Sequence, residues 1–185
     1  MKYIQSLICT LVLLLVNLVF SQISYAHVMV AQHGSLNIVD NGAFMVISLP
    51  VTAFKNVDDD NDGKLSAEEF SLHRASIAST IHEKITLSDN GNKIALQGMM
   101  LSPVNSHHTL QKPSSQLIVM GRYTLGSHNS QLQFEVDLFG VSPAEKEMEV
   151  TVTKKQNESR EVIKLSPQQT NVSLFSTATL TLAKK

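Results

Sequence analysis

Apolar and polar residues alternate along much of this chain with a period of two, which is the pattern of half-buried β-strands. The alternation is clearest over residues 132–138 and 148–152, where every second residue is apolar. Further apolar-rich segments complete the set of predicted strands: 35–40, 43–49, 85–87, 93–101, 116–125, 131–139, 162–165 and 174–182. The pattern therefore predicts a mainly β protein.

Turn-forming residues separate these predicted strands. Asp40-Asn41-Gly42 and Asp89-Asn90-Gly91 are hairpin signals, because Asn and Gly enter the left-handed backbone region at low cost. Residues 126–129 and 156–159 also have the composition of turns. Short strands at regular spacing are typical of two packed sheets, so we expect a β-sandwich of the immunoglobulin-like (Ig-like) kind.

One excursion, at about residues 50–84, changes to helical spacing between the second and third strands. Pro50 stands where a helix can begin, and apolar residues then recur three and four positions apart. Ser66 and Glu69 form a capping box, which is typical of the first turn of a second helix. We therefore expect a helix, a loop and a helix inserted into the β domain.

The loop of this excursion, residues 58–69, has the residue pattern of a calcium site. Calcium takes six to eight oxygen ligands, and acidic residues at alternate positions converge on one point. Gly63 permits the sharp bend, and Glu69 closes the loop with two oxygens. The predicted ligands are Asp58, Asp60, Asp62, the carbonyl of Lys64, Ser66 and Glu69.

These residues resemble the EF-hand family of calcium-binding proteins over about residues 49–84. The resemblance implies bound Ca²⁺ held by a helix-loop-helix. EF-hands generally come in pairs whose loops brace each other, and this sequence contains a single loop. We therefore expect the β domain to brace the loop, with a structural or partner-docking role for calcium.

Residues 1–26 have the features of a cleavable signal peptide. Lys2 precedes an apolar run of 14 residues, 7–20, which is short for a membrane span of about 20 residues. Cleavage after Ala26 predicts a single mature domain, 27–185, in the periplasm or secreted. Cys9 is the only cysteine and belongs to the signal, so the mature domain is expected to fold without disulfides.

Charge narrows the choice of function. The loop carries six acidic residues and one lysine, while the chain as a whole has a net charge of −1. No basic stripe with interleaved aromatic residues is present, which argues against nucleic-acid binding. The sequence also has no Gly-x-Ser-x-Gly or His-Glu-x-x-His motif, and we expect a protein that is not an enzyme.

A transition-metal site is an alternative interpretation. After cleavage His27 would offer its amine and its imidazole to one metal ion, copper or nickel. Further imidazoles are available from His33, His107 and His108, and methionine thioethers suit Cu(I). His73 and His82 are nine residues apart on the second helix and are expected at the surface.

A second resemblance covers residues 84–182. The segments Asp137-Leu138-Phe139, 163–167 and Leu174-Phe175 are similar to the extracytoplasmic domain of nickel permeases of the HupE/UreJ type, which also begins after an Ala-His. This sequence departs from that family because no membrane helices follow the β domain up to Lys185. The resemblance implies an accessory subunit beside a membrane or envelope partner, with no prediction of oligomeric state.

Overall fold

A computed structural model describes residues 32–104, 112–126 and 131–176. The predicted signal peptide lies outside the described residues, as do His27, His107 and His108. The structure is mainly β, with two sheets and one α-helix in its described part. The prediction of a mainly β fold is confirmed.

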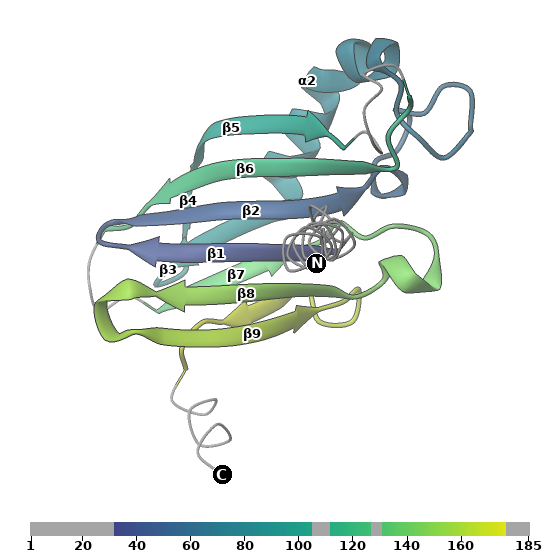
Figure 1. Cartoon of the computed structure of the whole chain (residues 1–185). Coiled ribbons are helices and arrows are strands. Elements are labelled where there is room, and N and C mark those ends of the chain that lie inside the picture. The colour runs from purple at the N-terminus through teal and green to yellow at the C-terminus, as the bar shows by residue number, and fades with distance from the viewer. Residues whose placement is uncertain (1–31, 105–111, 127–130, 177–185) are drawn as a thin grey trace, which may run out of the picture.

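The larger sheet has six strands, and in Figure 1 it faces the viewer. All its neighbouring strands are antiparallel except β1 and β8, which run parallel. In spatial order its strands are β5 (Leu96–Pro103), β6 (Gln116–Thr124), β2 (Gly42–Pro50), β1 (His33–Val39), β8 (Met148–Lys154) and β9 (Ser159–Leu165).

The smaller sheet lies behind the larger one in Figure 1 and is antiparallel throughout. In spatial order its strands are β10 (Asn171–Ser173), β7 (Leu132–Val136), β3 (Ile85–Asp89) and β4 (Asn92–Ile94). Buried apolar side chains from both sheets form one core. Tyr123 of β6 reaches across it, donating its hydroxyl hydrogen to the carbonyl oxygen of Ile85 of β3 at 3.5 Å.

The period-two pattern corresponds to burial in this core. On β7 the apolar residues are buried and the residues between them are not, and β8 repeats the arrangement. Both predicted hairpins are confirmed, since Val39 pairs with Gly42 and Asp89 pairs with Asn92. Their turns use positive φ angles, including 51° at Asp40, which explains the residue types found there.

Two predicted strands need correction. The segment 93–101 is two strands, because β4 ends at Ile94 and the chain passes at Ala95 into the larger sheet. The strand predicted over 174–182 begins earlier, as β10, and residues 174–175 form a turn. Phe175 holds this turn with a φ of 52° and donates its N–H to Glu161. Residues 177–182 lie outside the described residues.

Helix α2 (Ala67–Lys84) follows the predicted loop and begins at the predicted capping box. It buries Ile77 and Ile81 in the core and lies behind β5 in Figure 1. Across the described ranges no helix is long and apolar enough to cross a membrane.

The helix predicted before the loop is wrong. Only one 3-10 turn, η1 (Val51–Ala53), precedes the loop, and Phe54 is already extended. The backbone N–H of Val51 donates to the carbonyl of Ser115, and Asn56 has a left-handed φ of 58°, which a continuing helix does not allow. The excursion is therefore a loop followed by a helix, and the helix-loop-helix is only half formed.

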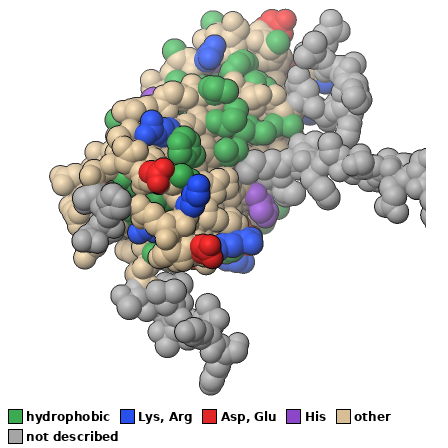
Figure 2. Space-filling view, turned by 60° about the vertical axis from the view of Figure 1, so that its left-hand side comes forward, with side chains coloured by type: hydrophobic (Ala, Val, Ile, Leu, Met, Phe, Trp, Pro, Cys, Tyr) green, Lys and Arg blue, Asp and Glu red, His purple; other side chains and the backbone are tan. Residues whose placement is uncertain are grey.

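The outer face of the larger sheet also carries apolar side chains. Phe44 of β2 and Met100 of β5 are 45% and 58% exposed. Figure 2 shows hydrophobic side chains gathered on one side of the molecule. The guanidinium of Arg122 lies 5.6 Å from the centre of the Phe44 ring, so a cation–π contact covers part of that ring.

Candidate metal centre

The predicted calcium loop is closed at its base by hydrogen bonds to the β domain. Leu65 and Ser114 form an antiparallel bridge, with N–H to carbonyl distances of 2.8 and 2.9 Å. On the other side of the excursion, Val51 donates its N–H to the carbonyl of Ser115 at 2.9 Å. The excursion therefore leaves the domain and returns to it at neighbouring residues. The β domain therefore holds the base of the loop.

Apolar side chains reinforce this attachment. Phe54, Val57 and Leu65 are all buried in the common core, at 7%, 2% and 2% exposure. The residues between Val57 and Leu65 are exposed or half-buried. The loop thus has an anchored base and a solvent-facing tip, and the tip contains the acidic residues.

Hydrogen bonds within the tip turn its carboxylates toward the backbone. Asp58 accepts from the N–H groups of Asp62 at 3.1 Å and of Gly63 at 2.8 Å. Asp60 also accepts from the N–H of Asp62, at 3.1 Å. Gly63 has a φ of 77°, a conformation that favours glycine, and this bend brings the N–H groups back toward Asp58.

Glu69 ties the end of the loop to its beginning. One carboxylate oxygen accepts from the N–H of Asp59 and the other from the N–H of Ser66, both at 2.8 Å. The Ser66 hydroxyl accepts in return from the N–H of Glu69 at 3.2 Å, which completes the capping box. Hydrogen bonds from Ser66 and then from Asp59 lower the pKa of Glu69 to about 2. Glu69 is buried, and its lowered pKa means that it is ionised at neutral pH.

Three of the predicted ligands converge. Asp58, Asp60 and Glu69 each place one carboxylate oxygen within 4.8 Å of the other two. The N–H of Asp62 lowers the pKa of Asp60, but local desolvation and the neighbouring carboxylates together outweigh it and raise that pKa above its ordinary value. A carboxylate has about four lone-pair sites, so these groups keep acceptor capacity for a cation.

The other predicted ligands are placed differently. Asp62 accepts from the N–H of Lys64 at 2.8 Å, and its second oxygen lies 3.8 Å from the Lys64 ammonium. It lies outside the cluster of converging oxygens. The Ser66 hydroxyl acts as the helix cap, beside the cluster. Six ligands were predicted from the sequence, and the structure brings together the carboxylates of three.

His73 is a functional candidate that the sequence interpretation missed. Its Nε2 atom lies 2.9 and 3.0 Å from the two carboxylate oxygens of Asp59. It was expected at the surface, but its side chain is only 19% exposed. His73 stands one helical turn after Glu69, and that spacing is the signal that places it against the loop.

Ser114 was also missed, and no local pattern marks it. Its side chain is 1% exposed, and its hydroxyl contacts the carbonyl oxygens of Val104 and Gln116 at 2.5 and 2.6 Å. Its backbone holds Leu65 of the loop at the same time. Ser114 therefore joins the predicted calcium loop to the neighbouring strands of the larger sheet.

Comparisons with known proteins leave the site to be interpreted from its own geometry. No protein-family model matches the chain. The search of curated proteins found no match either. Among the residues of the alternative transition-metal site, His33 alone is described, and it is exposed at the start of β1.

Proposed function

We propose that this protein is a non-enzymatic, extracytoplasmic calcium-binding protein. The observation that carries the proposal is the convergence of Asp58, Asp60 and Glu69 within 4.8 Å on a tightly bent loop. Several charged oxygens at one point are the ligands that Ca²⁺ prefers. A neutral or softer donor set would favour another metal.

The remaining predicted ligands would complete the coordination. Asp62 and Ser66 lie in the same loop as the three converging carboxylates, and Lys64 would contribute its backbone carbonyl. The cation would also relieve the repulsion among these carboxylates, which is the main cost of holding them together. The donor chemistry of the loop therefore fits a calcium ion, with Glu69 pre-positioned by its capping hydrogen bonds.

The role that we propose for calcium is structural, with partner docking as its consequence. Calcium would join Glu69, at the start of α2, to the loop tip and so fix that end of the helix. Leu72 of α2 is 72% exposed and offers an apolar contact for a membrane or envelope partner. Docking through this helix would then depend on calcium.

The proposal also includes an extracytoplasmic location and an Ig-like type of β-sandwich. A signal peptide over 1–26 would deliver the protein to the periplasm or outside the cell, where calcium sites are weak, with dissociation constants on the order of 10⁻⁴–10⁻³ M. We further propose that the β domain is an Ig-like sandwich. Two sheets with one common core support this assignment.

Isothermal titration calorimetry of the purified protein tests calcium binding directly. We expect one saturable site with millimolar or tighter affinity, and its loss in Asp58→Ala. The absence of calcium heat at millimolar concentration would refute the proposal, as would an Asp58→Ala variant that binds like the parent.

N-terminal sequencing of the exported protein tests the alternative metal site, because a start other than His27 removes the amine and imidazole pair.

A further inference from the structure

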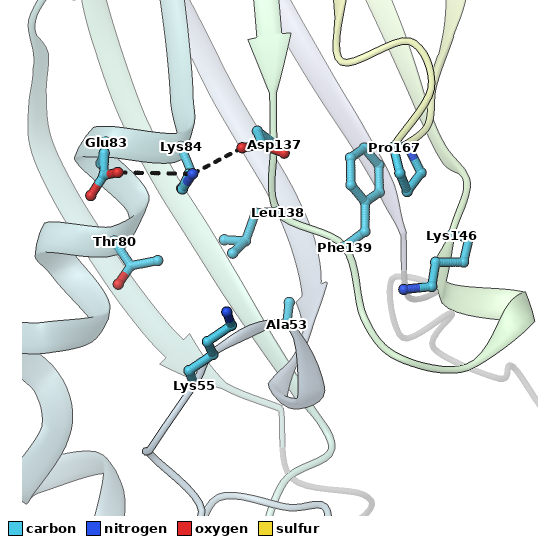
Figure 3. A pocket seen from close by; sticks show the side chains of 10 residues that line it. All are labelled: Ala53, Lys55, Thr80, Glu83, Lys84, Asp137, Leu138, Phe139, Lys146 and Pro167. Atoms are coloured by element: carbon cyan, nitrogen blue, oxygen red, sulfur yellow. Dashed lines mark hydrogen bonds and ion pairs between the residues drawn. The ribbon is translucent and has the colours of Figure 1, made fainter.

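A second candidate site is a cleft between the end of α2 and the segment that follows β7. Its volume is about 470 Å³, and Figure 3 shows the side chains around it. The lining residues come from five separate parts of the chain, and among them are five charged side chains: Lys55, Glu83, Lys84, Asp137 and Lys146. None of them belongs to the predicted calcium ligands.

One of the three lysines in the cleft is already paired. The Lys84 ammonium donates to Asp137 at 2.9 Å and lies 3.8 Å from a carboxylate oxygen of Glu83 (Figure 3). The hydrogen bond and charge attraction of Asp137 raise the pKa of Lys84, so this cation is fixed to the wall of the cleft. Lys84, Asp137 and Glu83 together carry one net negative charge.

The other two lysines are turned into the cleft without such a partner. In Figure 3 the ammonium groups of Lys55 and Lys146 point inward from opposite parts of the cleft. Within the described ranges no carboxylate lies within ion-pair distance of either group. With these two cations, the charged side chains of the cleft carry one net positive charge.

The cleft also offers apolar contact. Leu138 is 5% exposed, and Phe139 is half-buried against the core. Ala53 and Pro167 add further apolar surface to the lining. A bound ligand would therefore meet ammonium groups at opposite parts of the cleft and an apolar wall along its body.

We propose that this cleft binds a small organic anion, a monocarboxylate with a short apolar or aromatic body. The net positive charge matches a single negative charge. A phosphate dianion would face Glu83 and Asp137 on the same rim, and like charges at short range repel. Lysine acts as a point charge, so either ammonium group can attract a carboxylate without demanding a bidentate geometry.

The site does not depend on the calcium loop. Asp137 donates its backbone N–H to the carbonyl of Lys84 at 2.8 Å, which holds the two walls of the cleft together. Lys55 lies outside the predicted calcium loop, on a segment anchored by the buried Phe54. Anion binding is therefore expected both with calcium and with a chelator, and its test is separate from that of the calcium site.

NMR titration of the ¹⁵N-labelled protein tests the proposal, with phenylacetate as the probe. We expect saturable shifts of cleft amides with a dissociation constant on the order of 1–10 mM, as small ligands of this size reach. The double variant Lys55→Gln/Lys146→Gln should weaken binding by about tenfold or more, because the net charge of the cleft changes from +1 to −1 and then repels an anion. Both lysines are exposed, so the variant is expected to fold.

Matched controls distinguish the effect of the ligand's charge from that of its apolar body, and binding in the cleft from binding elsewhere on the protein surface. Lys155→Gln removes an exposed lysine on η3 (Lys155–Asn157), away from the cleft, and should leave the affinity unchanged. The neutral analogue 2-phenylethanol should give no saturable shift. The proposal is overturned if phenylacetate does not saturate, if the double variant binds like the parent, or if the neutral analogue or inorganic phosphate binds more tightly than phenylacetate.

Discussion

Removing calcium is expected to lower the thermal stability of the folded protein by a calculable amount. A ligand that binds only the folded state stabilises it by RT ln(1 + [L]/Kd). With a dissociation constant of about 10⁻⁴–10⁻³ M, ~10 mM calcium contributes about 1.4–2.7 kcal/mol. A domain of this size gains about 2–4 °C of Tm for each kcal/mol, so the melting temperature should rise by about 3–11 °C.

The structure explains why the unfolded chain should not share this affinity. Asp58, Asp60 and Glu69 meet within 4.8 Å because Gly63 bends the tip and α2 presents Glu69 from its first turn. Unfolding separates Glu69 from the other two carboxylates. The calcium-dependent rise in Tm therefore measures the folded site.

Asp58→Asn is the matched perturbation, because it removes one charge and keeps the size of the side chain. Loss of about tenfold in affinity would reduce the contribution of ~10 mM calcium to about 0.4–1.4 kcal/mol. In a chelator the variant should melt close to the parent, since weaker repulsion among the carboxylates offsets weaker hydrogen bonds. The variant and parent should thus differ in calcium and agree without it.

Circular dichroism melts in calcium chloride and in a chelator, at matched ionic strength, provide the measurement. Asp40→Asn is the control, because Asp40 is an exposed turn residue whose φ of 51° suits asparagine. It should keep the full calcium response. The reasoning is refuted if calcium gives no rise, if magnesium gives the same rise, or if Asp58→Asn keeps the parent's response.

Three further predictions concern pH and the core. The pKa of Glu69 is lowered to about 2, so its contribution to the free energy of unfolding is present above its ordinary pKa of 4.5 and is lost as pH falls toward 2. Glu69→Gln should reduce this loss of stability at acid pH, measured by urea unfolding. Burial raises the pKa of Tyr123, so stability should fall above about pH 10 by up to ~1.4 kcal/mol per pH unit. Tyr123→Phe should remove that alkaline loss, and an unchanged loss would contradict the assignment. Ile81 is fully buried, and Ile81→Ala should cost about 2–5 kcal/mol in urea unfolding, equally with calcium and with chelator.

The features that the sequence predicted well are local ones. The hairpin at Asp40 follows from two turn residues between apolar strands, and the start of α2 follows from Ser66 and Glu69 three positions apart. Each needs only neighbouring residues, so pattern and turn chemistry are sufficient. The convergence of Asp58 and Asp60 on Glu69 also rests on neighbouring residues, because Gly63 bends the tip between them.

The features that the sequence did not predict depend on distant partners. The segment 93–101 looks like one strand, but β4 pairs with β3 while β5 pairs with β6 in the other sheet. The residues after Pro50 have helical spacing, but the backbone is extended at Phe54, and Phe54 and Val57 pack into the core of the β domain. In both cases tertiary contacts overrode a local preference, and the choice of partner was not visible in the local pattern.

The way the loop is attached argues for structural calcium over a calcium switch. The bridge between Leu65 and Ser114 and the burial of Val57 use only protein atoms, so they hold the base of the loop independently of an ion. Calcium at the proposed site would then act mainly on the tip and on Glu69, with about 1.4–2.7 kcal/mol at ~10 mM. Converting a two-state element from 1:99 to 99:1 takes about 5.5 kcal/mol of differential binding. A lone site of this strength reaches at most about half of that value, so it can reinforce the arrangement of α2 but cannot drive a full exchange between two folds.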